Sequence, residues 1–134
     1  MTKHASGTFT VKIVPQAPEE AVGDPTVGRL ALDKQFSGDL EATSKGQMLA
    51  VRAEIQGSAG YVAMERVIGT LHGKSGTFAL QHSGTMDRGN PRLIITVVPD
   101  SGTAELAGIA GTMAIVIEGG KHSYDLDYTI GERP

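Results

Sequence analysis

Hydrophobic and polar residues alternate along most of this chain, and such alternation is typical of β-strands that bury one face. Residues 8–14 show the pattern first, with Phe9, Val11 and Ile13 on one side. It resumes at residues 26–36 and again at residues 40–52, where we expect a bulge or tight turn near Gly46. These three segments are therefore predicted to be half-buried strands.

A long β-hairpin is predicted for residues 60–84. Their Gly-Lys-Ser-Gly segment, residues 73–76, separates two runs of strand-forming residues, so the turn is expected to centre on the Lys-Ser pair. Because side chains alternate along each strand, Tyr61, Glu65 and His82 fall on the same face. In this register His82 lies diagonally across from Glu65, within reach of a long side chain.

Three further segments lack a clear alternation of hydrophobic and polar residues. Prolines and acidic residues at positions 16–25 predict a surface loop, with room for one helical turn at residues 19–22. Residues 92–98 are almost wholly apolar and form a strand whose two faces the pattern does not assign. The glycines of residues 101–111 predict a short strand and a turn.

A second hairpin is predicted at residues 113–130, around a two-glycine turn at residues 119 and 120. Its apolar face carries Tyr124 and Tyr128, whose hydroxyls need partners if they are buried. Both tyrosines are candidate ligand-binding residues. The alternative is that they are core aromatics with a hydrogen bond at the rim.

The whole pattern predicts an all-β fold. No segment has the periodicity of an amphipathic helix, and seven or eight short strands separated by turns indicate an antiparallel sandwich or barrel. A barrel leaves no long apolar edge, such as residues 93–98, without a partner. We therefore expect one domain, residues 1–134, forming a single antiparallel β-barrel of about eight strands.

Composition excludes several classes of function. The formal charge of -3, the absence of tryptophan and the low aromatic content argue against nucleic-acid binding. The chain has no cysteine, so disulfides and thiolate metal sites are excluded. No apolar run approaches the roughly 20 residues of a membrane helix, and the first residues lack the apolar core of a signal peptide. We expect a cytoplasmic protein with no membrane partner.

No cofactor or metal is expected. The sequence lacks a phosphate-binding loop, a dinucleotide fingerprint and the nucleophile motif Gly-x-Ser-x-Gly. The histidines do not converge: His72 falls on the face opposite His82, and a zinc site needs three or four ligands. Glu105 is interpreted as a structural residue that hydrogen-bonds the adjacent glycine-rich turn.

Glu65 is the sharpest candidate for chemistry, because a carboxylate in the middle of an apolar strand requires a partner. If its face lines the barrel interior, burial is expected to raise its pKa, and His82 could share its proton. Tyr61 would add a phenol to the same region. Two alternatives stay open: Glu65 pairs with an arginine or lysine as a satisfied buried site, or this face is outside and Arg66 is inside.

Three sequence motifs follow one another along the chain. They are Tyr-Val…Glu-Arg…Gly-x-Leu-x-Gly at residues 61–73, Gly-x-Phe-x-Leu-Gln-His at residues 76–82, and Ser-Gly-Thr-x-Glu-Leu-x-Gly-x-x-Gly at residues 101–111. In this combination the chain resembles the bacterial domain-of-unknown-function family 3224 over residues 9–128. The resemblance implies an eight-stranded barrel similar to allene oxide cyclase and, more distantly, to dirigent proteins, which bind apolar small molecules in the lumen. That family has no assigned reaction, so the resemblance implies a fold and not an activity.

Three functions are compatible with these observations. The first is binding of a small, largely apolar molecule in the lumen, oriented by Tyr61, Glu65 and His82. The second is a cofactor-free isomerase or cyclase that uses the same residues as acid and base, and the sequence does not decide between the two. The third is a packed barrel without a usable cavity that acts through protein contacts. Analogy with the related barrels favours a homo-oligomer.

Overall fold

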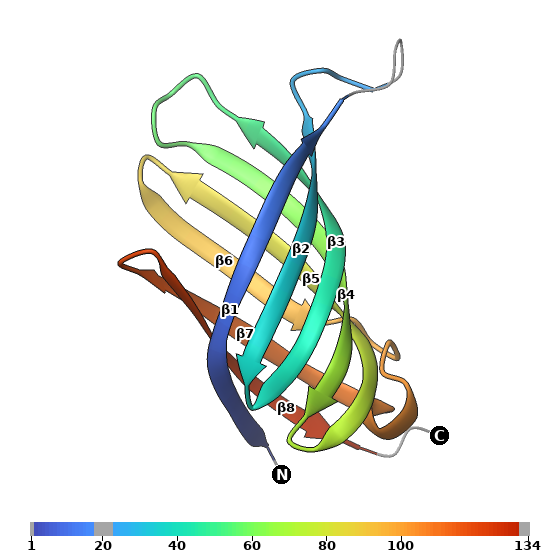
Figure 1. The fold of residues 1–134 in the computed structure, drawn as a ribbon. Helices are drawn as coiled ribbons and strands as arrows, with labels where there is room; N and C mark the ends of the chain where they lie inside the picture. The colour runs from blue at the N-terminus through green and yellow to red at the C-terminus, as the bar shows by residue number, and fades with distance from the viewer. Residues whose placement is uncertain (1, 18–22, 132–134) are drawn as a thin grey trace.

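The structure, a computed structural model, describes residues 2–17 and 23–131. Eight antiparallel strands follow one another in chain order and close into a barrel, as predicted (Figure 1). In the described residues one 3₁₀ turn, η1 (Ala104–Leu106), interrupts the strands. The strands are β1 (Lys3–Gln16), β2 (Gly28–Gly38), β3 (Leu40–Arg52), β4 (Ala59–Leu71), β5 (Lys74–Asp87), β6 (Asn90–Val97), β7 (Ile109–Glu118) and β8 (Lys121–Ile130).

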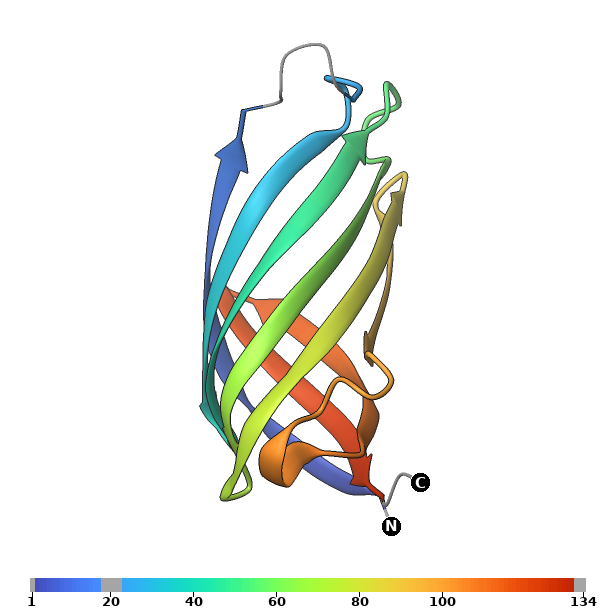
Figure 2. The same cartoon turned by 90° about the vertical axis from the view of Figure 1, so that its right-hand side faces the viewer.

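The start of β1 and the end of β8 lie at the lower end of the barrel (Figure 2). Buried side chains fill this end. Every second residue of each strand points inward, so the alternation in the sequence becomes an apolar interior. The fully buried members of this core include Phe36, Leu40, Leu71, Phe78, Leu80, Leu106, Tyr124 and Leu126.

The upper part of the barrel is open on one side, because β7 and β8 are short and do not reach its top (Figure 2). β8 pairs with β1 only from Lys3 to Phe9, whereas β1 pairs with β2 up to Gln16. β6 and β7 share two pairs, Ile95 with Met113 and Thr96 with Thr112. The upper wall therefore consists of β1 to β6, which surround a hollow.

The β4–β5 hairpin turns earlier than the sequence analysis expected. Its two turn residues are His72 and Gly73, with φ of 46° and 80°, and not the Lys-Ser pair that follows. Positive φ at both positions gives the turn a twist that matches the strands. Glu65 consequently faces Leu80, and His82 faces Ala63. The register differs from the predicted one by an even number of residues, so Tyr61, Glu65 and His82 still share the inner face.

The expected break in the third strand is also wrong. β3 is continuous, and Gly46 lies within its unbroken ladder opposite Glu65. A Cβ atom on Gly46 would approach the Met64 carbonyl oxygen to 2.3 Å and the Glu65 Cβ to 2.7 Å. Glycine is therefore needed there for close approach of β4 and not for a bend.

Burial and strand pairing show how the remaining segments, residues 92–98 and 101–111, are arranged. In β6 the inward residues include Ile95 and Val97, both buried, which assigns the faces that the sequence left open. Where residues 101–111 were expected to begin with a short strand, the chain forms η1, and β7 starts at Ile109. The helical turn considered for residues 19–22 lies outside the described residues. The described ranges contain no helix with the length and hydropathy of a membrane span.

Candidate functional site

Four buried polar side chains meet inside the barrel beneath the hollow. They come from four consecutive strands, β2 to β5, and are Lys34, Ser44, Glu65 and His82, here called the Glu65 cluster. Their exposed fractions are 8, 3, 2 and 3 %, and they are all of the buried polar side chains in the described residues. A barrel interior that is otherwise apolar thus concentrates its polar groups in one place.

Glu65 is the acceptor at the centre of the cluster. Its Oε2 accepts hydrogen bonds from Lys34 Nζ at 2.8 Å and from His82 Nε2 at 2.7 Å, and its Oε1 accepts one from Ser44 Oγ at 3.0 Å. The Lys34 ammonium also lies over the rings of Phe9 and Phe36, 5.2 and 5.9 Å from their centres. These contacts hold the lysine charge beside the carboxylate.

The pKa of Glu65 is lowered below its ordinary value of 4.5, which contradicts the expected rise. Burial alone would raise this pKa, but the hydrogen bond from His82 and the charge of Lys34 together outweigh it. Glu65 is therefore ionised at neutral pH. A carboxylate can only accept, so the hydrogen-bonding pattern assigns the proton of a neutral His82 to Nε2 and leaves Nδ1 as an acceptor.

Two glycines make room for the site. Gly46 lies opposite Glu65, as described above, and Gly84 lies opposite Tyr61. A Cβ atom on Gly84 would come within 2.4 Å of the Tyr61 ring, so that ring lies directly against the β5 backbone. The ring centres of Tyr61 and His82 are 6.4 Å apart. Both side chains thereby face the hollow from neighbouring strands.

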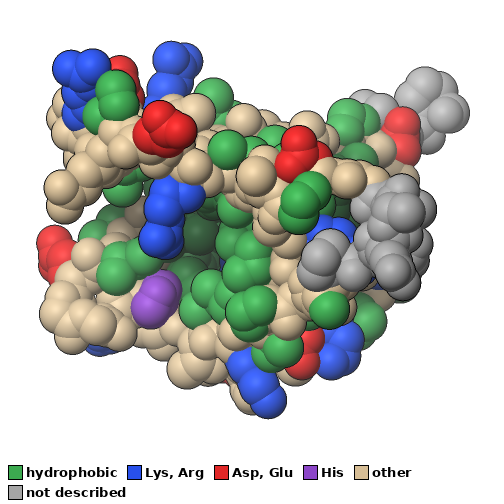
Figure 3. Space-filling model, turned by 90° about the horizontal axis from the view of Figure 1, so that it is seen from above, with side chains coloured by type: hydrophobic (Ala, Val, Ile, Leu, Met, Phe, Trp, Pro, Cys, Tyr) green, Lys and Arg blue, Asp and Glu red, His purple; other side chains and the backbone are tan. Residues whose placement is uncertain are grey.

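The hollow has a volume of about 510 Å³, and its surface is predominantly apolar (Figure 3). The polar residues of its lining are Tyr61, Lys34 and His82, together with Thr85, Arg92 and His122. Neither the Tyr61 hydroxyl nor His82 Nδ1 has a hydrogen-bond partner in the described part of the chain. The pKa of Tyr61 is raised, by burial and then by the negative charge of Glu65, so its phenol stays protonated and can donate. The apolar lining includes Phe9, Val11, Leu32, Met48, Leu93 and Ile115.

The structure brings three of the five predicted site residues together, Tyr61, Glu65 and His82. The other two, Tyr124 and Tyr128, lie in the packed lower core and do not line the hollow. The Tyr124 hydroxyl accepts from the Leu40 N–H at 2.9 Å and donates to the Ser37 carbonyl at 3.0 Å. Tyr128 hydrogen-bonds His72 in the β4–β5 turn. Both tyrosines are thus hydrogen-bonded core residues, which was the alternative to a role in ligand binding.

Lys34 and Ser44 were missed by the sequence analysis. A signal for Lys34 was present, because it continues the inward alternation of Leu30, Leu32 and Phe36 in β2. Its salt bridge to Glu65 matches the alternative in which the carboxylate pairs with a lysine. Ser44 carried no comparable signal, since small polar residues occur on either face of a strand.

Glu105 has the structural role expected of it, but with a different partner. Its Oε1 accepts the backbone N–H of Ser75 at 3.0 Å, which fixes η1 against the start of β5. Within the described ranges, no three of the His, Asp and Glu side chains are grouped so that they could hold a metal ion.

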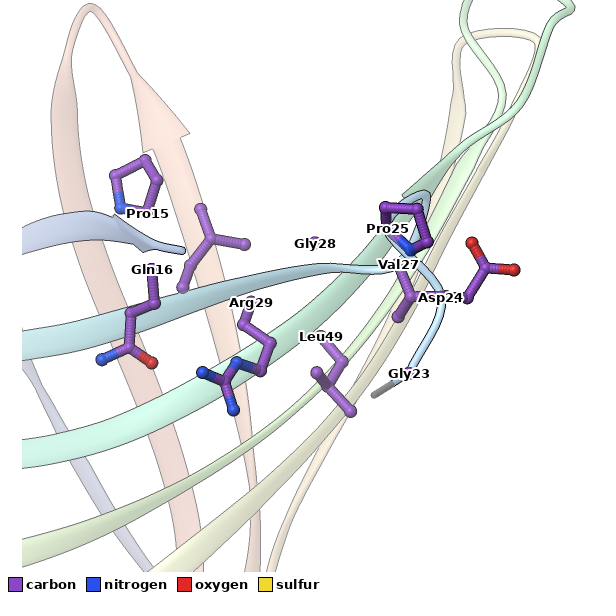
Figure 4. Close-up of a pocket in the computed structure, with 10 residues that line it drawn as sticks. Pro15, Gln16, Gly23, Asp24, Pro25, Val27, Gly28, Arg29 and Leu49 are labelled. Carbon is purple, nitrogen blue, oxygen red and sulfur yellow. The ribbon is translucent and has the colours of Figure 1, made fainter. Parts of the chain in front are cut away.

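Two other hollows lack such convergent chemistry. One, of about 490 Å³, lies at the upper rim between the end of β1 and the start of β2, where Gln16, Arg29 and Leu49 approach from three strands (Figure 4). The second, of about 910 Å³, is on the outer wall of β3 to β5. Its lining includes Glu65 and His82, but their side chains are buried, and the exposed side chains there are ones such as Met64 and Arg66. The hollow above the Glu65 cluster is therefore the candidate site.

A family model described as a protein of unknown function, DUF3224, matches residues 5–128 of the chain. The chain belongs to the DUF3224 family. It is also similar to a crystal structure of a DUF3224 protein of unknown function from Shewanella oneidensis MR-1, with 46 % sequence identity and a TM-score of 0.89. That similarity covers 98 % of this chain and 100 % of the other. Among curated proteins no match was found. Membership in DUF3224 thus supports the barrel and assigns no activity.

Proposed function

We propose that this DUF3224 barrel binds a compact, largely apolar molecule in the hollow above the Glu65 cluster. The observation that carries the proposal is the combination of an apolar hollow of about 510 Å³ with two polar groups in its lining that have unused hydrogen-bonding capacity, Tyr61 and His82. Ligand sites commonly enclose about 300–1,000 Å³ and combine apolar walls with a few placed polar groups.

The polar pair Tyr61 and His82 in the lining is suited to an uncharged polar group on the ligand. The Tyr61 hydroxyl can donate a hydrogen bond, and His82 Nδ1 can accept one. Glu65 holds His82 in this tautomer from behind and is itself bonded to Lys34 and Ser44, so it is a positioning residue. The likeness to the lumen-binding barrels of the allene oxide cyclase type, inferred from sequence motifs, supports the same location.

Binding can be tested with the uncharged fluorophore N-phenyl-1-naphthylamine, titrated against the purified protein and excited beyond the absorption of tryptophan. Ile115 lines the hollow, whereas its neighbour Val116 is exposed on the outer face. We expect Ile115→Trp to fill the hollow and weaken binding about tenfold or more, a change of about 1.4 kcal/mol. Val116→Trp adds the same ring outside and should leave affinity unchanged.

Two results would overturn the proposal. One is the absence of saturable binding to the unmodified chain. The other is equal affinity of the Ile115→Trp and Val116→Trp variants, because the fluorophore would then be bound outside the hollow.

A second candidate function, a cofactor-free isomerase or cyclase, is supported by the hydrogen bond of 2.7 Å between Glu65 and His82. An ionised carboxylate at Nε2 stabilises the protonated imidazole that forms when Nδ1 takes a proton from a substrate. Tyr61 would donate to a developing oxyanion, and His82 would return the proton at another carbon. In this scheme His82 is the acid–base group, and Glu65 acts through it.

The enolisable ketone 2-tetralone provides a test, since its α-protons exchange for deuterium in D₂O only after proton removal. Exchange followed by proton NMR should be faster with the unmodified chain than with His82→Gln. Ile115→Trp retains the Glu65 cluster but blocks the hollow, and it should also lose the acceleration. Equal rates with and without protein would count against the acid–base function and leave binding as the role to pursue.

A further inference from the structure

Lys34 differs from every other lysine of the described residues in its surroundings. It is buried, with 8 % of its surface exposed, whereas the other described lysines are exposed. It belongs to the lining of the hollow, and its Nζ is 5.2 Å from the ring centre of Phe9, which lines the hollow as well. The described part of the chain therefore places one lysine, and no aspartate or glutamate, in the lining of this apolar space.

The Glu65 cluster meets the hollow through two of its four members. Lys34 and His82 belong to the lining, whereas Glu65 and Ser44 do not. Glu65 Oε2 accepts from Lys34 Nζ at 2.8 Å and from His82 Nε2 at 2.7 Å, so the carboxylate lies next to both lining residues. A molecule in the hollow is therefore adjacent to a lysine that already has its own counter-ion.

A lysine in these surroundings is suited to form an imine with a carbonyl compound. An ammonium group has no free electron pair, so Nζ first has to lose a proton. Transfer of that proton to Glu65 Oε2 over 2.8 Å leaves two neutral groups, and in an apolar interior this costs less than leaving one charge alone. Lysines that are desolvated in apolar pockets form Schiff bases with carbonyl substrates.

We propose that Lys34 forms a protonated imine with an apolar aldehyde or ketone in the hollow. Nζ bonds to the carbonyl carbon, and a proton moves from nitrogen to the carbonyl oxygen to give a carbinolamine. Glu65 then passes the proton it took from Lys34 to that oxygen, the carbon–oxygen bond breaks, and water leaves as the nitrogen electron pair completes the double bond. The product keeps one positive charge and one N–H, so the buried ion pair with Glu65 is preserved. This inference rests on the proposed binding function and adds the chemical class of the ligand.

Reduction of the imine in place provides the test. We would incubate the purified protein with 2-naphthaldehyde and sodium cyanoborohydride, and follow by mass spectrometry and peptide mapping which lysine acquires a naphthylmethyl group. Lys45 is the internal control, because it is also paired with a carboxylate, Asp33 at 3.0 Å, but is exposed outside the hollow. We expect Lys34 to be labelled about tenfold faster than Lys45, since the hollow holds the aldehyde beside it. N-phenyl-1-naphthylamine should protect Lys34 and not Lys45.

Three variants separate the lysine from the space around it. Lys34→Arg keeps a positive charge for Glu65 but has no amine, so the fast labelling should disappear. Ile115→Trp retains Lys34 and fills the hollow, and it should slow labelling of Lys34 about tenfold or more. Val116→Trp adds the same ring outside and should leave the labelling unchanged.

The inference is overturned if Lys34 is labelled no faster than Lys45, or if the fast labelling persists in Lys34→Arg or in Ile115→Trp. These results leave the binding function intact as long as 2-naphthaldehyde, without reductant, still displaces N-phenyl-1-naphthylamine from the unmodified chain. Failure of that fluorophore to bind removes both proposals.

Discussion

Glu65 depends for its charge on Lys34 and His82, which come from two other strands. Its partner Lys34 is 31 positions away in sequence, and both side chains are almost wholly buried. Removing one member of a buried ion pair leaves the other charge without compensation, which typically costs about 3–5 kcal/mol. Replacing one carboxylate oxygen of Glu65 by an amide nitrogen should therefore strongly lower the stability of the whole barrel.

We expect Glu65→Gln to lower the free energy of unfolding by about 3–5 kcal/mol, measured by urea denaturation. The double variant Lys34→Met/Glu65→Gln removes both charges and should recover most of that loss. As a control, the exposed pair Lys45–Asp33, whose charged atoms are 3.0 Å apart, should cost less than about 1 kcal/mol when broken by Asp33→Asn. A similar loss for Glu65→Gln and Asp33→Asn would show that the buried pair contributes no more than a surface pair.

The lowered pKa of Glu65 also predicts how stability depends on pH. Since its pKa in the folded chain lies below 4.5, the unfolded chain binds this proton at higher pH than the folded chain does. The stabilisation is thus complete above the unfolded pKa and is lost as pH falls through the folded value. The urea midpoint should decrease below about pH 5, and less steeply in Lys34→Met/Glu65→Gln. If the unmodified chain and the double variant had identical pH profiles, the lowered pKa of Glu65 would be contradicted.

At the scale of elements, the alternation of hydrophobic and polar residues was enough to predict which face of a strand each side chain is on. It was not enough to predict the register in which the strands pair. The predicted β4–β5 turn was displaced, yet Tyr61 and His82 were still placed together, because an even shift preserves the side of every residue. The partner of Glu65 could not be found in the same way. Lys34 reaches it across β3, and which strands lie side by side is fixed by barrel closure and not by any single strand.

The β4–β5 turn itself yields a prediction with a matched control. Gly73 has φ of 80° and no atom within 4 Å of an added Cβ, so only its backbone conformation requires glycine. We expect Gly73→Ala to destabilise the barrel by about 1–2 kcal/mol in urea denaturation. Gly28 in β2 has comparable space but no positive φ, and Gly28→Ala should be neutral or slightly stabilising. Equal effects of the two substitutions would mean that the turn adopts another conformation in solution.

For the whole molecule, the decisive feature is that the barrel closes at one end and stays open along one side at the other. β4 is paired along its full length with both neighbours, from Ala59 to Leu71. β1 has a partner on both sides only at residues 7–9, and beyond Phe9 it pairs with β2 alone. The open side gives a ligand access to the hollow without any movement of the packed lower core.

Amide hydrogen exchange measured by NMR can test this opening. Successive residues of a strand direct their N–H groups to opposite sides, so in residues 10–16 of β1, where Pro15 has no N–H, alternate N–H groups have no strand partner. We expect protection to alternate along this segment and to be continuous along the middle of β4. Continuous protection in both would mean that the upper edge of β1 is covered in solution. If that protection disappeared on dilution, the cover would be a second copy of the chain, which would agree with the expected homo-oligomer. Alternating protection at every concentration would leave the hollow open to solvent and assign the whole site to a single chain.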